Sequence, residues 1–268
     1  MSEKENQSIF MKKEFNGIKM VMSDAIPKTL AAYYVANPQN IDILKIKLQA
    51  NGFEILSTEE ILKDKTVVTV TNAELKQSNS FIAALHILVD GTKEIRVQNP
   101  SYFGAAFLQE KYRYGQFKGT LMALHASLGD MYETEDKMNL NELSGYHFML
   151  GMPHVDNTID VARGKDLFEK IKSNKASKYI SYTLSLPNGS ILVGHRLSEE
   201  TNKFLTSIHV ENKALILPYG SIIKENKAYI LAPKYYLALS LPLLQMTDFM
   251  KIATTPDAIQ QDIERAYE

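Results

Sequence analysis

Apolar positions along the chain follow two spacings, one typical of strands and one typical of helices. Apolar runs of strand length at 82–89 and 94–98 surround an Asp90-Gly91 turn, which predicts a β-hairpin. Isoleucine and leucine recur at helical spacing over 41–48, and Asn51-Gly52 follows as a helix end. Because both spacings are interleaved, the pattern predicts a mixed α+β fold.

The second half of the chain repeats this order of features. Its pattern predicts a helix, a hairpin and two further strands, at 160–171, 179–193, 214–217 and 228–231 respectively. Each half also contains one strand pair followed by a proline-led helix. The order of elements therefore indicates an internal repeat.

Helix starts recur at matching places in the two halves. Asn99-Pro100 and Ala232-Pro233 place prolines 133 residues apart, each in a predicted first helical turn, where a missing N–H costs nothing. Thr71 and Glu74 form a capping-box pattern, and Ser198 is expected to cap a helix in the second half. We interpret the chain as one α/β unit used twice.

The predicted fold class is α+β, with two repeated units packed with pseudo-two-fold symmetry. Each unit is expected to be an antiparallel sheet covered by helices. The expected divisions are an N-terminal extension at 1–30, a first unit at 31–128, a linker at 129–159 and a second unit at 160–268. The cleft between the units is the expected ligand site, because pockets favour domain interfaces.

Several short motifs resemble the bacterial DUF302 domain. They are Gly-Phe-Glu-Ile-Leu at 52–56, Thr-Asn-Ala-Glu-Leu at 71–75, the strand that ends in Asn99-Pro100, and Leu215-Ile-Leu-Pro218 in the second half. The resemblance implies two tandem, divergent copies of that fold. It implies no activity, because the family is of unknown function. Many members carry a cysteine where this chain has Asn72, so no thiol-dependent role is expected here.

Composition removes several classes of function. The 268 residues include no cysteine, which excludes disulfides, Cys-ligated metal centres and a thiol nucleophile. Lys and Arg number 30 against 31 Asp and Glu, for a net charge of −1. Without a basic cluster, we expect no nucleic-acid partner.

The chain holds no apolar stretch of about 18 residues, so no membrane span is expected. Its polar start has no signal-peptide core. Two interpretations stay open. Met1 is the native start of a cytoplasmic protein, or it was added to a periplasmic or secreted chain whose signal was removed.

Five residues are candidates for ligand binding. Tyr102 and the pair Tyr235 and Tyr236 follow the two helix-start prolines, and tyrosine combines an apolar ring with a polar tip. His86 interrupts an apolar strand, and Arg96 lies on the strand predicted beside it. Such a buried ionisable pair can mark a pocket. The alternative is structural: the tyrosines pack helix on sheet, and His86 bonds backbone.

Two histidines and two methionines in the predicted linker are candidates for a metal site. His147, Met149, Met152 and His154 flank Gly151, and imidazole with thioether suits Cu(I). On extended backbone, His147 and Met149 share one face, and Met152 and His154 share another. The alternative is a core strand in which methionine fills space.

We favour a non-catalytic module that binds a small molecule or a protein partner. An enzyme with an acid–base site in the cleft is a second hypothesis, with His86, Arg96 or His125 as candidates. A copper- or metal-handling protein is the third. The sequence names no cofactor and no oligomeric state.

Overall fold

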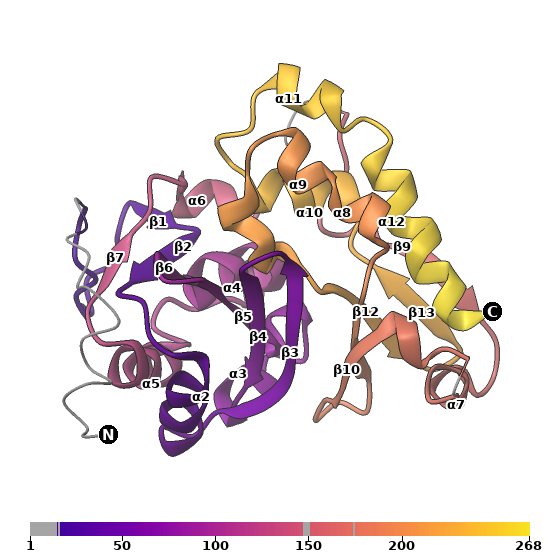
Figure 1. The fold of residues 1–268 in the computed structure, drawn as a ribbon, viewed down its shortest axis with the longest axis horizontal. Helices are drawn as coiled ribbons and strands as arrows, with labels where there is room; N and C mark the ends of the chain where they lie inside the picture. The colour runs from indigo at the N-terminus through magenta and orange to yellow at the C-terminus, as the bar shows by residue number, and fades with distance from the viewer. Residues whose placement is uncertain (1–14, 16, 147–150, 174) are drawn as a thin grey trace.

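The computed structural model describes residues 15, 17–146, 151–173 and 175–268. Within them the chain is a mixed α+β protein with antiparallel sheets, as the hydrophobic pattern predicts. One sheet comes from the N-terminal half and another from the C-terminal half (Figure 1). The helices α4 (Pro100–Leu108) and α10 (Pro233–Ser240) lie near the middle of the molecule.

The first sheet has six antiparallel strands. Their order across the sheet is β3 (Glu54–Leu62), β4 (Lys65–Thr71), β5 (Leu85–Asp90), β6 (Glu94–Gln98), β2 (Tyr33–Ala36) and β7 (Met131–Glu133). All residues of the central strand β5 are buried, which fits its nearly continuous apolar run. The edge strand β3 is only partly buried, and its polar residues are available at the surface.

The second sheet has five antiparallel strands. Their order is β10 (Ile180–Ser185), β11 (Ile191–His195), β12 (Tyr219–Lys224), β13 (Lys227–Ile230) and β9 (Ile159–Arg163). In the first sheet, the earliest strand, β2, pairs with β6, the fifth of its strands along the chain. In the second sheet, the earliest strand, β9, pairs with β13, which is also the fifth. The five strands of the second sheet thus follow the same order as the first five of the other sheet.

A two-stranded sheet and the remaining helices complete the fold. The strand β1 (Thr29–Ala31) pairs with β8 (Lys137–Asn139). The remaining α-helices are α2 (Ile41–Ala50), α3 (Ala73–Lys76), α5 (Lys118–Leu128), α6 (Leu140–Leu143), α7 (Leu167–Ile171), α8 (Glu199–Asn202), α9 (Phe204–Ser207), α11 (Met246–Lys251) and α12 (Thr255–Glu264). The segment predicted as a linker contributes β7 to the first sheet and β8 to the smaller pair.

Local sequence explains where several helices begin. The Asn99 side chain accepts a hydrogen bond from Ser101 N, and Pro100 occupies the first turn of α4 as predicted. Ser198 caps α8, also as predicted. The predicted Thr71 cap is wrong, because Asn72 accepts from Leu75 N while the Thr71 hydroxyl donates to the carbonyl of Ala83.

Two predicted elements are wrong for one physical reason. The expected helix at 160–171 divides into the strand β9, which pairs with β13, and the short helix α7. The expected strand at 214–217 lies mostly in a 3₁₀ segment, Glu211–Ile216, and β12 begins only after the cis Leu217–Pro218 bond. Both segments contact partners that are distant in sequence, and such contacts override local pattern.

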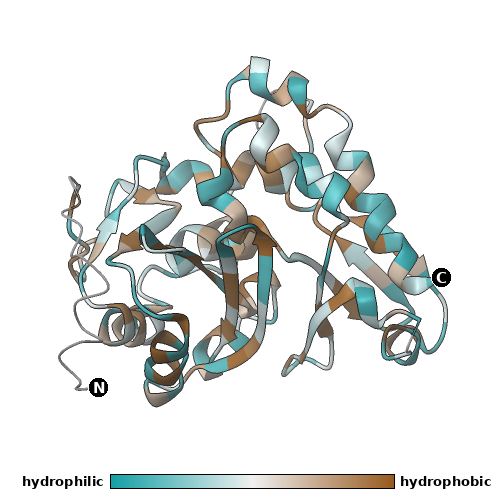
Figure 2. Cartoon of the chain, in the orientation of Figure 1, coloured by the Kyte–Doolittle hydropathy of each residue, from teal (hydrophilic) through white to brown (hydrophobic). Residues whose placement is uncertain are grey.

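The two halves share a hydrophobic core. A single cluster of buried side chains includes Leu85 and Phe103 from the first half and Leu215 and Ile230 from the second. Hydrophobic residues gather on the central strands and helices, whereas much of α12 on the outside is hydrophilic (Figure 2). In the described part of the chain, no helix combines the length and apolarity that a membrane crossing needs.

Candidate functional site

The three candidate tyrosines are buried at the contact between the halves. Tyr102 is 0% exposed and Tyr235 is 2% exposed. The Tyr102 hydroxyl donates to Leu239 O at 2.8 Å, and the Tyr235 hydroxyl donates to Ala106 O at 3.5 Å. Tyr236, on the same helix as Tyr235, donates to a backbone carbonyl as well. Each hydroxyl therefore ties helix to backbone, and ligand binding by these tyrosines stays a prediction.

His86 is a buried, backbone-bonded histidine. It is 5% exposed, and its Nδ1 lies 2.8 Å from Leu215 O, in the other half of the chain. Burial lowers the pKa of His86 to about 4, although the hydrogen bond to Leu215 acts in the opposite direction. The imidazole is thus neutral at pH 7, and its Nδ1 carries the proton that the carbonyl accepts.

His86 and Tyr236 line the same narrow cavity. Its volume is about 30 Å³, and aromatic side chains from both halves, including Phe103, Phe107 and Tyr219, form much of its wall. This space is about the size of one water molecule, so it is too small for an organic ligand. The part of the expected cleft that contains two predicted residues is therefore too narrow for an organic ligand in this structure.

Arg96 belongs to a buried group of charges instead of forming a pair with His86. Its Nε and Nη2 donate to Glu94 Oε1 at 3.0 and 2.7 Å. Lys213, from the second half, forms an ion pair with Asp136 and lies 4.9 Å from the centre of the Tyr33 ring. Burial lowers the pKa of the Lys213 ammonium, and the Asp136 carboxylate opposes that change. The charges balance, so this group joins the halves without demanding a ligand.

The metal hypothesis is only partly visible. His147 and Met149 lie outside the described residues, and Met152 is half-buried. The His154 Nε2 lies 3.3 Å from Gln109 Nε2. Among the residues that the structure describes, no group of three or more His, Asp or Glu side chains is arranged to hold a metal ion.

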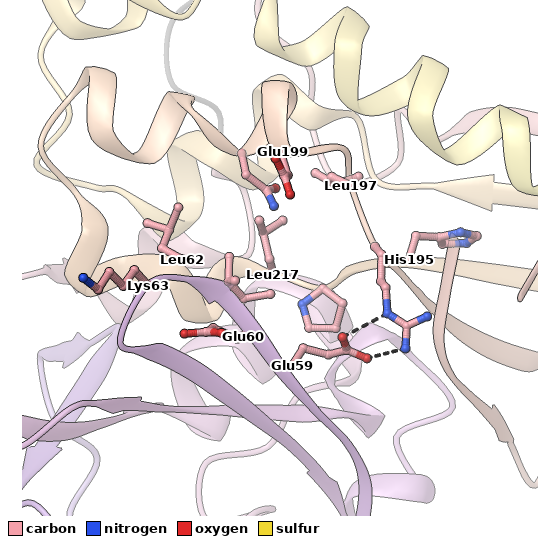
Figure 3. A pocket seen from close by; sticks show the side chains of 12 residues that line it. Glu59, Glu60, Leu62, Lys63, His195, Leu197, Glu199 and Leu217 are labelled. Carbon is pink, nitrogen blue, oxygen red and sulfur yellow. Dashed lines mark hydrogen bonds and ion pairs between the residues drawn. The ribbon is translucent and has the colours of Figure 1, made fainter. Parts of the chain in front are cut away.

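A larger, open pocket of about 520 Å³ lies between the halves, beside the narrow cavity (Figure 3). Its walls come from the β3–β4 hairpin at 59–63, from the segment that joins β11 to α8, and from Leu217–Pro218. Sites for small organic molecules measure roughly 300–1,000 Å³. The pocket therefore has the volume of a small-molecule site.

Aliphatic side chains supply much of the pocket surface. They are Ile61, Leu62, Leu197, Leu217 and Pro218. In Figure 3, Leu62 and Leu217 lie between the hairpin of the first half and the helix α8 of the second. Such a surface gains free energy when an apolar body displaces water from it.

A bidentate ion pair between the two halves forms one wall of the pocket. Arg196 Nε donates to Glu59 Oε2 at 2.9 Å, and Arg196 Nη2 donates to Glu59 Oε1 at 2.7 Å (Figure 3). The Ser181 hydroxyl also donates to Glu59 at 3.1 Å. A carboxylate held by two guanidinium N–H groups has a fixed orientation. The pair therefore fixes the position of β3 relative to the second half.

Other polar groups of the pocket are less fully paired. Glu60 accepts from the backbone N–H of Asp64 at 3.2 Å. Glu199 lies in the first turn of α8, and Figure 3 places its carboxylate at the pocket. Asn202 follows one helical turn later, and its Oδ1 is buried with no hydrogen-bond partner among the described residues. The pocket thus offers hydrogen-bond acceptors beside an apolar wall.

His195 borders the pocket, but its imidazole points into the core. The Nε2 of His195 lies 2.7 Å from Ser221 Oγ, which is 2.8 Å from the Tyr267 hydroxyl. Figure 3 shows the ring turned away from Leu62 and Glu199. Burial lowers the pKa of His195 to about 3, so the ring is neutral at pH 7. It is not placed to exchange a proton with a molecule in the pocket.

Sequence reasoning missed this pocket. Its residues come from three segments, and the first and last of these are more than 100 positions apart in the sequence. The alternation of apolar and polar residues predicts strands, but it does not predict which distant segments come together. One local signal was present: the acidic pair Glu59-Glu60 interrupts a strand, and Arg196 is the basic residue after β11. No family model matches the sequence, and neither a curated protein nor a solved structure matches it.

Proposed function

We propose that the protein is a non-catalytic module that binds a small organic molecule in the pocket between its halves. The observation that carries the proposal is the pocket itself, about 520 Å³ in volume, lined by aliphatic side chains together with charged and polar groups. A concave site of this volume, in which convergent polar groups lie beside apolar side chains, is typical of ligand-binding proteins.

The positions of the acid–base candidates favour binding over catalysis. A general acid or base must reach the reacting atom within hydrogen-bond distance. His86 and Arg96 are buried in their own contacts, and neither lines the open pocket. His125 is exposed on α5, with its Nε2 3.7 Å from Asp130. None of the three is positioned to act on a molecule in the pocket.

We also propose that the chain is a duplicated α+β unit, packed about a pseudo-two-fold axis and related to DUF302 domains. The shared strand order supports this. A second support is reciprocal bonding: Tyr102 donates to Leu239 O, and Tyr235 donates to Ala106 O. The two donors, Tyr102 and Tyr235, are 133 positions apart in the sequence, and so are the two acceptors, Ala106 and Leu239. Such reciprocity is the signature of an isologous two-fold contact.

A blocked pocket tests the binding proposal. We expect Leu197→Trp to fill the pocket, and Ile46→Trp, on the exposed face of α2, serves as the matched control. A library of small organic molecules is screened by thermal shift against the wild type and both variants. Compounds that stabilise the wild type and the control should fail to stabilise Leu197→Trp.

Two outcomes would overturn the proposal. One is that no compound stabilises the wild type. The other is that Leu197→Trp, with a wild-type circular dichroism spectrum, responds like the wild type. Ile61→Trp, at another wall of the pocket, repeats the test in case the first variant folds poorly.

A further inference from the structure

We infer that the pocket between the halves selects an organic cation, namely an amine on an apolar body, over neutral or anionic molecules of the same shape. The inference rests on the proposed binding function and adds the chemical class of the ligand. It follows from which charges at the pocket are already neutralised, which acceptors have no donor, and where the apolar wall lies.

The first step is the balance of charge at the pocket. Glu59 and Arg196 neutralise each other through their two hydrogen bonds. Among the described lining residues, this leaves the carboxylates of Glu60 and Glu199 and the ammonium of Lys63. Lys63 is exposed at the tip of the hairpin, and Figure 3 shows it directed to the outer end of the pocket. Glu60 and Glu199 are exposed as well, so the open side of the pocket carries two carboxylates against one ammonium, an excess of one negative charge.

The second step concerns hydrogen bonds. Glu199 and Asn202 are three residues apart on α8, so their side chains lie on one face of the helix. The Asn202 Oδ1 is buried and lacks a donor in the described part of the chain. A buried acceptor without a donor costs free energy. The oxygen is closed to solvent, so a ligand N–H would recover that free energy once the amide rotates toward the pocket. An ammonium has several N–H donors and no acceptor, which matches these two side chains.

The third step excludes an anion at the same end of the helix. A helix N-terminus attracts anions, but the N-terminus of α8 already has acidic partners. The Asp262 carboxylate accepts hydrogen bonds from Ser198 N at 2.9 Å and from the Thr201 hydroxyl at 2.6 Å. Glu199 adds a second negative charge in the first turn. An incoming carboxylate or phosphate would meet like charge there.

The apolar wall sets the rest of the ligand. Leu62, Leu197, Leu217 and Pro218 supply apolar lining to the pocket. In Figure 3, Leu62 and Leu217 lie below the carboxylate of Glu199. An amine bound to Glu199 would therefore place its hydrocarbon portion on these side chains, where each buried CH₂ contributes about 0.8 kcal/mol.

Three probes with one apolar body and different charge test the inference. They are 2-phenylethylamine, 2-phenylethanol and 3-phenylpropionate, titrated into the full chain by calorimetry or NMR. We expect the amine to bind at least roughly tenfold more tightly than the other two, because it alone pairs with a carboxylate. Raising the salt concentration should weaken binding of the amine more than binding of the alcohol, because salt screens the attraction between the ammonium and the carboxylates.

Neighbouring glutamates supply a matched pair of variants. Glu199→Gln should lower amine affinity roughly fivefold and leave the alcohol unchanged. Glu200→Gln removes the same charge one residue away, where Glu200 pairs with Lys203, and should change neither. Lys63→Gln should strengthen amine binding, because it removes a cation from the rim.

The outcomes separate this inference from the proposed function. If the alcohol or the carboxylate binds as tightly as the amine and Leu197→Trp abolishes that binding, the pocket is a ligand site and the cation preference is wrong. Equal effects of Glu199→Gln and Glu200→Gln would also overturn the preference. If none of the probes binds and the library gives no pocket-dependent stabilisation, both proposals fail.

Discussion

His86 on β5 and His195 at the end of β11 are neutral, buried side chains. His86 donates to a carbonyl of the opposite half, whereas His195 bonds a serine hydroxyl within its own half. Burial holds the pKa of His86 near 4 and that of His195 near 3, both below the usual value of 6.5. Neither ring can become charged without losing its place in the core, so both make folding sensitive to acid.

The free energy of unfolding should fall as the pH drops below about 6.5. The unfolded chain binds protons on these histidines from that pH downward, while the folded chain does not until about pH 4 for His86 and about pH 3 for His195. Each histidine then contributes a slope of up to about 1.4 kcal/mol per pH unit. Urea denaturation between pH 7.5 and pH 4.5 measures the total.

Two substitutions isolate the contribution of His86. His86→Asn removes the titrating group and keeps an N–H donor for Leu215 O, so its stability should depend less on pH than that of the wild type. His209→Asn is the control, because His209 is exposed and its φ of 57° suits asparagine. A wild-type pH dependence in His86→Asn would refute the assignment.

Some helices begin with help from a distant carboxylate. The helix α5 has no side-chain cap at its own N-cap residue, Phe117. Instead, Glu74 on α3 accepts hydrogen bonds from Gly119 N at 3.2 Å and Thr120 N at 2.6 Å. At the start of α8, Asp262 accepts a hydrogen bond from the N–H of Ser198, the residue whose own hydroxyl caps the helix. These carboxylates accept hydrogen bonds from backbone N–H groups, and their negative charge interacts favourably with the positive N-terminal end of the helix dipole.

Glu74→Ala should destabilise the protein by about 1–2 kcal/mol, the value of a lost N-cap. Both backbone N–H groups at the start of α5 would lose their acceptor, and the effect would be read as a lower free energy of unfolding in urea. The comparison is Glu169→Ala, which removes an exposed carboxylate paired with Lys172 on α7. Exposed pairs contribute little. If the two variants were equally stable, the capping role of Glu74 would be wrong.

Helices and strands that depend on neighbouring residues in the sequence could be predicted. Elements that depend on contacts with distant parts of the chain could not. Asn99-Pro100 determines the start of α4, and the hairpin of β10 and β11 follows from alternation around Asn188-Gly189. The strand β9 exists because β13, more than 60 residues later, offers it an edge. The pocket has the same kind of origin, because Glu59 and Arg196 are 137 positions apart in the sequence and meet only in the folded chain.

At the scale of the whole molecule, the two halves are joined through side chains that neither half could bury alone. The Tyr102 and Tyr235 rings lie in the shared core, and each hydroxyl donates to a carbonyl of the other half. The 3₁₀ segment Glu211–Ile216 of the second half packs against β4, β5 and β6 of the first. Separation would expose this apolar surface and leave the charges of Arg96 and Lys213 without part of their surroundings.

The halves should therefore unfold together in one cooperative transition. The chain contains no tryptophan, so a single introduced tryptophan reports on one location. Ile46→Trp and Met250→Trp place that reporter at exposed sites in the first and second halves, where 65% and 70% of the native side chains are exposed. Urea unfolding followed by fluorescence should give the same midpoint and the same denaturant dependence for both variants, and circular dichroism should coincide with them. Two separated midpoints would mean that each half is stable alone. The pocket would then be a site between independent domains, whose geometry depends on how they dock, instead of a site built into one cooperative core.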